Sequence, residues 1–457
     1  MSTVGPDPAA AAAGLEQFGY RQQLRRALST SDLVIFGLIF MVPVAPFGVF
    51  GFVWNDSRGM VALAYLVGLV GMFFTAMSYA SMSRAFPVAG SVYSYVQRGL
   101  HEVAGFFSGW LILLDYILVP ALLYIFSMIA LRPLLPAVPD WLWLSAFVVF
   151  NAVVNLLGVQ LTARVNRYIL ALELVVLALF VACAAVALHA GRGSGGLTLL
   201  PIYNPAQFSL ATVTGATSIA VLSFLGFDGI STLAEESRGG LDSVARATVL
   251  SLLLVGVLFI GQTWLATDLA QGMKFSSPET AFYEIADRAA GNWLRIICMG
   301  ATAVSAGIAN AMVAQSAVAR ILFAMARDGK LPAVLARVHP RYQTPYISTL
   351  VVAGVSLLIG LLFAKHVDEL SRIVNFGALT SFVLLHIAVI HHFVIRGGSR
   401  HWIRHLVMPL SGLVVIGYVL FEMGMDAKIM GTCWIAIGAG YFLVVRYVLK
   451  KSSALEI

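Results

Sequence analysis

A single carboxylate lies in the middle of a long apolar segment. Residues 224–237 have the sequence FLGFDGISTLAEES, in which Asp228 lies between Gly226 and Gly229. A carboxylate at the depth of a lipid bilayer costs about 2.5 kcal/mol or more, so an acidic residue there is expected to be functional. We expect the two glycines to interrupt the helix, and interrupted backbone is tolerated in lipid only where it lines a cavity. The pattern therefore predicts a substrate site of a secondary transporter.

Two further acidic residues lie in apolar segments. Asp115 stands beside Tyr116, and Glu173 lies about two turns into its own segment. A carboxylate and an aromatic ring both bind ammonium groups, so Asp115 and Tyr116 are candidates for holding an amine. Burial favours the neutral form of a carboxyl group, so Glu173 could take up and release a proton or serve as a second cation site. A structural role, such as a bond to a neighbouring helix, remains an alternative for each acid.

A pair of glutamates, Glu235 and Glu236, follows Asp228 by about two turns. We expect them near the end of their segment, in a solvated vestibule or in salt bridges with Arg238 or Arg246.

The composition explains how these acids come to lie at membrane depth. Hydrophobic residues make up 60% of the 457 residues and charged residues only 11%, and the mean hydropathy is +0.88. A soluble domain carries roughly 25% charged residues, so most of this chain is expected in a membrane. A spanning helix needs about 20 apolar residues. Twelve such segments are present, at about 31–53, 60–83, 103–131, 141–160, 166–189, 210–234, 244–268, 293–322, 347–364, 370–394, 405–422 and 429–449.

The basic residues predict the orientation. Most of the 29 lysines and arginines fall in the termini and in the loops on the same side as the termini. The positive-inside rule therefore predicts a multi-pass protein with both termini in the cytoplasm, and residues 1–30 as a cytoplasmic tail. The net charge of +7 is dispersed over many short loops, which gives no indication of nucleic-acid binding.

The first apolar segment has its own interruption. Pro43 and Pro46 lie mid-span, and each proline removes a backbone hydrogen bond, so we expect unwinding between Met41 and Phe47. Interruptions in the first and sixth spans occupy corresponding places if the first ten helices form two repeats of five. This division predicts repeats at 31–200 and 201–400, followed by two extra helices in 401–457. A pair of kinked packing helices is the alternative.

Four motifs together resemble those of the amino acid, polyamine and organocation (APC) superfamily. They are FPVAGSVYSYV at 86–96, FLGFDGISTLAEES at 224–237, ARILFAMARDGKLP at 319–332 and VHPRYQTP at 338–345. The resemblance covers most of the chain and implies an all-α membrane protein with the LeuT-type fold, an inverted repeat of five plus five helices. GWLILLDYILVP at 109–120, VNFGAL at 374–379 and HLVMPLSG at 405–412 most resemble the bacterial putrescine importers. The resemblance thus implies a bacterial cytoplasmic (inner) membrane.

The resemblance also implies roles for individual residues. Tyr116 is expected at the substrate together with Asp115, and Asp228 is expected to brace the second interruption or to join a proton path. In proton-coupled relatives a lysine stands near the position of Glu173, so Glu173 is a candidate for proton coupling by different chemistry. Tyr93 and Phe227 are candidates for gating. The remaining substrate-binding candidates belong to the two interruptions, and they are Met41, Val44, Ala45, Phe47, Ser223, Phe224 and Leu225.

The first interruption departs from the pattern of many amino-acid carriers in this superfamily. Those carriers have a GxGIF-type sequence whose bare amides hold the substrate carboxylate, whereas this chain has MVPVAPFG. Prolines at 43 and 46 remove two donors, which favours a substrate without an α-carboxylate. The amides of Val44, Ala45 and Phe47 can still be presented.

These patterns predict a secondary transporter that imports a small cationic amine such as putrescine, by proton symport. One alternative is a proton-coupled amino-acid permease with the same fold. A membrane enzyme or a receptor is the other alternative, but the sequence has no nucleophile motif, dinucleotide fingerprint or metal-ligand spacing, so we expect no cofactor and no metal. Three histidines near the end of the tenth segment are expected at the membrane interface, and they are His386, His391 and His392.

Overall fold

The computed structural model describes residues 26–444, except for residues 87, 89–90, 240 and 365. Within these residues the regular structure is helical, apart from an isolated bridge between Leu28 and Ser237. Residues 1–25 of the predicted N-terminal tail and residues 445–457 lie outside the described residues.

The first half of the chain contains α2 (Thr30–Met41), α3 (Pro46–Ser57), α4 (Val61–Ala85), α5 (Ser91–Gly99), α6 (Glu102–Leu131), α7 (Asp140–Leu157) and α8 (Val159–His189). The following part contains α9 (Leu210–Ala220), η1 (Val221–Phe224), η2 (Asp228–Glu236), α10 (Leu241–Ala270), α11 (Ala281–Ala290), α12 (Asn292–Val304), η3 (Ser305–Asn310), α13 (Ala311–Arg327) and η4 (Ala333–Ala336). The last part contains α14 (Tyr346–Phe363), α15 (Val367–Val389), η5 (Ile390–Arg396), η6 (Ile403–Val407), α16 (Met408–Glu422) and α17 (Met425–Leu443).

The predicted membrane architecture is confirmed. Within the described residues, ten helices are long and apolar enough to cross a membrane, and α2 and α3 together make an eleventh span that is bent by 51°. The last of the twelve predicted segments, 429–449, is described only in part, as α17. The chain is thus an all-α, multi-pass membrane protein.

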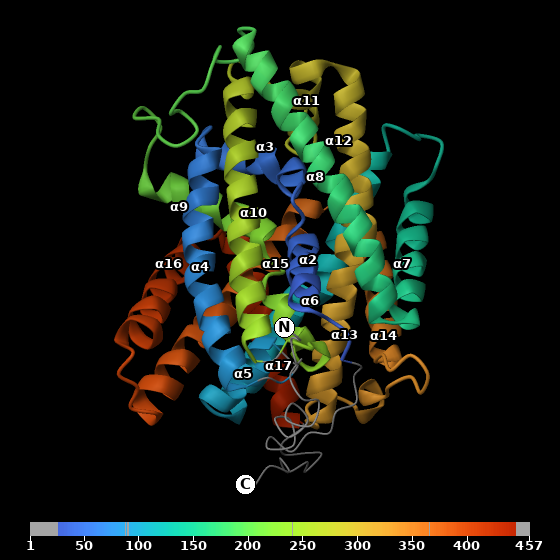
Figure 1. The fold of residues 1–457 in the computed structure, drawn as a ribbon, viewed down its shortest axis with the longest axis vertical. Helices are drawn as coiled ribbons and strands as arrows, with labels where there is room; N and C mark the ends of the chain where they lie inside the picture. Colours follow the sequence, from blue (N-terminus) through green and yellow to red (C-terminus); the bar gives the residue numbers. More distant parts are fainter. Residues whose placement is uncertain (1–25, 87, 89–90, 240, 365, 445–457) are drawn as a thin grey trace, which may run out of the picture.

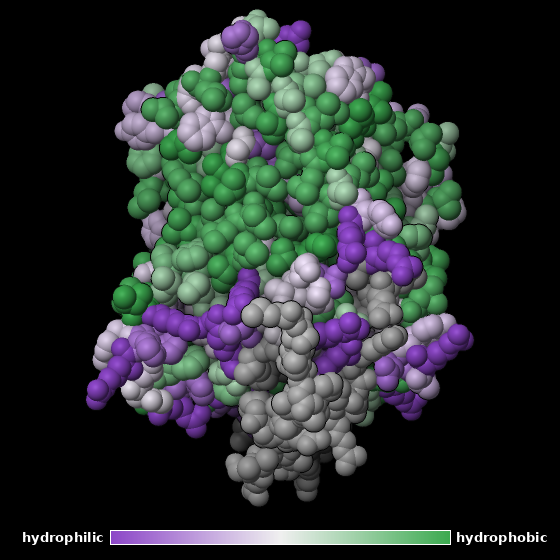
Figure 2. All heavy atoms as spheres, in the orientation of Figure 1, coloured by the Kyte–Doolittle hydropathy of each residue, from purple (hydrophilic) through white to green (hydrophobic). Residues whose placement is uncertain are grey.

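Two short helices mark the opposite ends of the bundle. Figure 1 shows α5 at one end and α11 at the other, with the long helices running between them. We call these ends the α5 face and the α11 face. Figure 2 shows, on the face in view, an apolar band across the middle of the molecule and hydrophilic residues gathered toward the α5 face. Such a band is what a bilayer requires of the surface that contacts it.

The order of elements recurs along the chain. An interrupted span (α2 and α3) is followed by α4, the short α5, then α6, α7 and α8. A second interrupted span (α9, η1 and η2) is followed by α10, the short α11, then α12 to α13, α14 and α15. The predicted division at residues 200 and 400 follows this recurrence and stays a prediction.

The interrupted spans are joined at their ends on the α5 face. Ser29 caps α2: its hydroxyl oxygen accepts from the Asp32 amide, and the Ser29 amide donates to the Asp32 carboxylate, so two amides at the start of the helix are satisfied. Just before this cap, the amides of Ala27 and Leu28 donate to the Glu236 carbonyl at 3.0 and 3.1 Å. The start of the first span and the end of η2 are therefore tied together.

The prediction that His386 lies at the membrane interface is wrong. Its side chain is fully buried between α4 and α15, where its ring nitrogens make hydrogen bonds with Thr75 and Ser78 at 3.2 and 2.9 Å. A position on α16, Gly412, leaves room for the ring, because a Cβ there would lie 2.3 Å from it. His386 is a satisfied core residue that joins three helices.

Candidate functional site

The first interruption separates α2 from α3 near the middle of the span. α2 ends at Met41, and Val42 takes a positive φ of 53°, a conformation that a β-branched residue adopts only under constraint. α3 begins at Pro46, whose fixed φ suits the first helical position. The predicted unwinding between Met41 and Phe47 therefore agrees with the helix boundaries.

The second interruption lies beside the first. α9 tightens into η1, the chain turns through Leu225 to Phe227, and η2 begins at Asp228. Gly226 has a φ of +120°, which favours glycine, and a Cβ at this position would lie 2.7 Å from the ring of Phe40 on α2. Glycine at 226 thus permits both the turn and the close approach of the two broken spans.

A cavity lies between these two interruptions. Its volume is about 70 Å³, several times the roughly 10–15 Å³ that one water needs, so it fits a small molecule. Its lining comes from both broken spans, from α6 and from the span that contains η3. The lining residues are Phe40, Met41, Val42, Val44, Ala45, Gly48, Val49, Asp115, Tyr116, Val119, Leu122, Leu123, Phe126, Leu222, Ser223, Leu225, Gly226, Thr302, Ala306 and Asn310. We call this the central cavity.

Most of the predicted substrate-binding residues line the central cavity. Those that do are Met41, Val44, Ala45, Asp115, Tyr116, Ser223 and Leu225. Phe47 and Phe224 do not line it. The Phe47 ring stacks on Phe282 with centroids 4.0 Å apart, and the Phe224 ring packs against Phe259 at 5.1 Å, so both rings belong to the surrounding aromatic core.

The amides at the two interruptions are largely occupied. Ala45 donates to the Val42 carbonyl at 2.8 Å, and Phe47 donates to the Val44 carbonyl at 2.9 Å. Proline at 46 has no amide proton. At the second interruption the Gly226 amide donates to the Asp228 carboxylate at 3.2 Å. Few amides are therefore left for a bound carboxylate, whereas the C-terminal end of α2 at Met41 brings the partial negative charge of a helix C-terminus to the cavity.

Asp115 is the acidic side chain in the lining of the central cavity. It is 2% exposed, and its Oδ1 atom has no hydrogen-bond partner among the described residues. A buried polar atom without a partner is uncommon in a native structure, and it costs about 1–3 kcal/mol, more if charged. The arrangement leaves a carboxylate oxygen ready to accept a donor from a bound molecule.

Asp228 lies behind the cavity wall, where several donors converge on it. The Tyr116 hydroxyl donates to Asp228 Oδ2, and the Tyr79 hydroxyl donates to the same atom at 3.5 Å. Together with the Gly226 amide, these donors join α4, α6 and the second interruption. Hydrogen bonds thus join Asp228 to the backbone of the second interruption and to Tyr116, which lines the cavity.

Glu173 is the most isolated acid of the described spans. It is fully buried on α8, and neither of its carboxylate oxygens has a hydrogen-bond partner. Its polar neighbour is Ser305, which begins the π-helical turn η3. Glu173 does not line the central cavity, but the other side of η3 does, through Ala306 and Asn310.

The π-helical turn η3 was not predicted from the sequence. It interrupts the span between α12 and α13, and such turns often occur at functional sites. Asn151 on α7 donates to the Gly307 carbonyl at 2.8 Å, which satisfies one backbone group of the turn. The signal that could have revealed it is SAGIAN at 305–310, small and polar residues inside an apolar span.

The two predicted gating residues lie between the central cavity and the α5 face. Tyr93 on α5 donates to Asp328 at the end of α13 at 2.7 Å. Phe227 is fully buried, and its ring lies 5.8 Å from the rings of both Tyr79 and Phe382. These contacts fill the space on the α5 side of the cavity.

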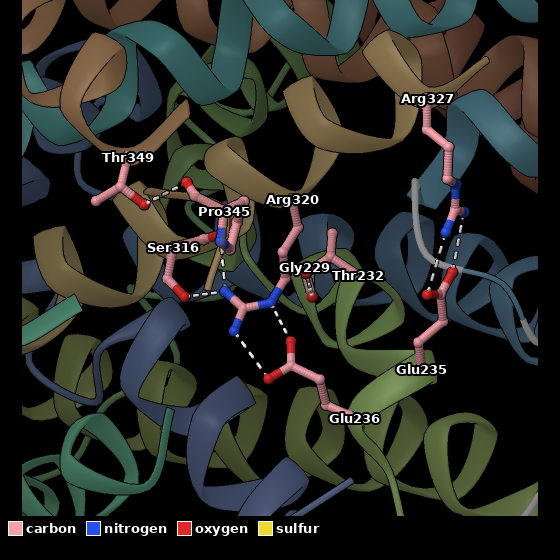
Figure 3. Close-up of polar contacts among 9 residues, drawn as sticks. All are labelled: Gly229, Thr232, Glu235, Glu236, Ser316, Arg320, Arg327, Pro345 and Thr349. Atoms are coloured by element: carbon pink, nitrogen blue, oxygen red, sulfur yellow. Dashed lines mark hydrogen bonds and ion pairs between the residues drawn. The ribbon is translucent and has the colours of Figure 1, made fainter. Parts of the chain in front are cut away.

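The prediction that Glu235 and Glu236 face a vestibule or pair with Arg238 or Arg246 is wrong. Figure 3 shows Arg320 directed at Glu236 and Arg327 directed at Glu235. In the first pair both side chains are at most 5% exposed, and Arg320 also donates to Ser316. In the second pair the Glu235 side chain is fully buried, and the nearest N–O distance is 3.0 Å. The end of η2 is therefore clamped to α13 by two buried ion pairs.

Comparison with known proteins identifies the family. The family model described as amino acid permease matches residues 33–449. The chain belongs to the amino acid permease family. This permease is 31% identical over 434 residues to the low-affinity putrescine importer PlaP of Escherichia coli (strain K12), covering 93% of this chain and 94% of PlaP.

Two further relatives, both from Bacillus subtilis (strain 168), cover the same shares of the two chains. The branched-chain amino acid permease BcaP is 28% identical, and the methylthioribose transporter is 26% identical. These findings confirm the predicted resemblance to the APC superfamily and to putrescine importers. This permease is a transporter of amino acids or amines, not an enzyme.

Proposed function

We propose that this permease imports a small cationic amine such as putrescine, by proton symport across a bacterial inner membrane. The observation that carries the proposal is Asp115, a buried carboxylate in the lining of the central cavity with an oxygen that no protein donor occupies. An ammonium group supplies up to three donors and the charge that offsets the burial of a carboxylate.

The remainder of the cavity suits the rest of such a molecule. One ammonium would bind Asp115, and the C-terminal end of α2 would favour a second positive group. The lining also includes an apolar stretch of α6, with Val119, Leu122 and Leu123, which suits a chain of methylene groups. The occupied amides at both interruptions argue against a substrate that needs a carboxylate cradle.

The proposed transport cycle opens the central cavity to each side in turn. We place both termini, and with them the α5 face, in the cytoplasm, because most basic residues lie on that side. In the described structure the α5 side is closed by the ion pairs of Glu235 and Glu236 and by the contacts of Tyr93 and Phe227. Release of substrate to the cytoplasm would require η2 to separate from α13.

Glu173 is the proposed proton carrier. It is a fully buried carboxyl group beside η3, and the other side of η3 lines the central cavity, so its charge could be linked to the state of that cavity. Asp228 is proposed to sense whether substrate is bound, because its hydrogen-bond donor Tyr116 lines the cavity. It is also proposed to brace the second interruption during the cycle.

Competition between two substrates that differ by one carboxylate tests the substrate class. The purified protein would be reconstituted into liposomes, and uptake of labelled putrescine would be measured with unlabelled putrescine, ornithine or alanine added outside. The proposal predicts strong competition by putrescine, weaker competition by ornithine and none by alanine. Uptake of alanine without uptake of putrescine would contradict it.

An amino-acid permease is the second candidate function. The similarity to BcaP favours it. Val44 favours it too, because this residue lines the cavity and its amide donates none of the turn hydrogen bonds of the first interruption, so it could donate to a carboxylate. The same competition experiment separates the two functions, because this candidate predicts that an α-carboxylate is required.

A further inference from the structure

A second cavity lies between the central cavity and the α11 face. It is formed by the end of α3, by α9, by the start of α15 and by the segment between α16 and α17. Its volume is about 190 Å³, larger than that of the central cavity. We call it the outer cavity.

The two cavities share a wall. Val49 on α3 and Leu222 on η1 line both of them, so these apolar side chains form the partition between the cavities. A molecule that moves from the α11 face to the central cavity by this route passes through the outer cavity first. On the α5 side, by contrast, aromatic contacts and two buried ion pairs block the way.

The outer cavity has a chemistry of its own. Two carboxylates line it, Asp56 at the end of α3 and Glu422 at the end of α16, together with one guanidinium, from Arg372. The charged groups of the lining thus carry a net negative charge. A cavity with low-dielectric walls and one excess charge attracts ligands of the opposite charge.

A buried amide also lines this cavity. Asn375 is 3% exposed, and its Nδ2 atom donates to the Ser218 carbonyl at 2.8 Å. Its Oδ1 atom has no partner among the described residues. Because an amide oxygen only accepts hydrogen bonds, this atom could accept one from a donor such as an ammonium group. Glu422, which is half-buried, and Asn375 come from different spans, so the cavity is lined by acceptors from two separate helices.

We infer that the outer cavity is a separate binding site for a small cationic amine, which occupies it before crossing the Val49–Leu222 partition. The class of ligand rests on the proposed function of the central cavity, but the occupancy of the outer cavity does not require Asp115. Glu422 and Asn375 supply the acceptors for the ammonium group. Glu422→Gln should weaken the binding of the amine at this site about fivefold, as expected for the loss of one partly exposed ion pair.

Protection of a cysteine in the outer cavity tests this inference. Ser371 lines the cavity, and its hydroxyl bonds within its own helix to the Val367 carbonyl, so Ser371→Cys is a mild change. The two cysteines with exposed surface, Cys183 and Cys433, would first be replaced by serine. The rate of modification by a cationic methanethiosulfonate would be measured on the full-length protein in liposomes, with increasing putrescine.

The inference predicts that putrescine slows the modification, and that this protection persists with Asp115→Asn. It also predicts that Glu422→Gln raises the putrescine concentration for half-protection about fivefold. Glu369→Gln is the matched control, because Glu369 is an exposed acid on the same helix as Ser371 and does not line the cavity. This control should leave the protection unchanged.

The outcomes separate this inference from the proposed function. Protection that disappears with Asp115→Asn, or no protection in a protein that takes up putrescine, would overturn the outer site and leave the proposed function standing. Protection by alanine in place of putrescine would overturn the outer site as an amine site. Protection that depends on Glu422 but not on Asp115, in a protein without putrescine uptake, would support the outer site and contradict the proposed function.

Discussion

Tyr116 donates its hydroxyl hydrogen to Asp228, and this bond connects the wall of the central cavity to the second helix interruption. Tyr116 lies on the continuous helix α6, whereas Asp228 begins η2, the half of the broken span that leads to the α5 face. The bond is therefore a direct link between the proposed substrate position and the element proposed to move.

This link predicts a strong energetic coupling between the two residues. Tyr116→Phe and Asp228→Asn should each lower the thermal unfolding temperature, because each leaves a buried polar group with fewer partners. Since Tyr116→Phe removes the bond and Asp228→Asn weakens it to a neutral one, the double variant should be more stable than the sum of the single effects predicts, by about 1 kcal/mol. Additive effects in this double-mutant cycle would show that the two residues are not energetically coupled.

Asp115→Asn should weaken the binding of amine without unfolding the protein. It removes a charge from a buried position that lacks a protein partner, so the apo protein should be as stable or more stable. The loss of a charge-assisted bond costs about 1.5–3 kcal/mol, or roughly a tenfold to hundredfold rise in KM for putrescine uptake. Asp426→Asn, at an exposed acid at the start of α17, is the control with the same change of charge and should leave KM unaltered.

Glu173→Gln should uncouple transport from the proton gradient. Glutamine has the shape of the protonated glutamate but cannot release a proton. Exchange of labelled for unlabelled putrescine at equal pH should therefore continue, while uptake no longer responds to an inward proton gradient. A variant that keeps wild-type acceleration by the gradient would exclude Glu173 as the proton carrier.

The ion pair of Arg320 with Glu236 should contribute far more to stability than an exposed pair does. Glu236→Gln leaves a buried guanidinium without its counter-charge, which costs about 3–5 kcal/mol, and thermal unfolding should reveal it. The control is Asp140→Asn, which breaks the exposed pair of Arg132 with Asp140 and should cost about 1 kcal/mol or less. Equal losses of stability in the two variants would contradict the claim that the Arg320–Glu236 pair is buried and therefore costly to break.

Gly226→Ala should abolish uptake, whereas Gly261→Ala should not. Gly226 has a φ of +120°, and a Cβ there would meet the Phe40 ring and backbone at 2.7–3.0 Å, so the turn and the approach of α2 would both be strained. Gly261 lies on α10 and lines neither cavity, and a Cβ there would meet nothing within 4 Å. The measurement is uptake by matched amounts of reconstituted protein. A fully active Gly226→Ala variant would show that the close contact with Phe40 is dispensable.

Much of the membrane architecture could be predicted from the sequence because its signals are local. Apolar length marks the spans, and the prolines at 43 and 46 mark the first interruption through the hydrogen bonds that they cannot make. Gly226 and Gly229 mark the second interruption through their missing side chains. These signals need no knowledge of neighbouring helices.

The partners of the charged residues could not be predicted in this way. Arg320 and Arg327 follow Glu236 and Glu235 by 84 and 92 residues, so only the packing of η2 against α13 brings them together. Proximity in sequence instead suggested Arg238 and Arg246. The same reason explains His386, whose burial depends on hydroxyls of α4 and a glycine of α16.

The most direct test of the account is uptake of labelled putrescine into proteoliposomes under an imposed inward proton gradient, compared with the same vesicles without a gradient. The account predicts accumulation that depends on the gradient, and its loss in Asp115→Asn at low putrescine concentration. Vesicles that accumulate no putrescine under the gradient, while they exchange a neutral amino acid, would contradict it.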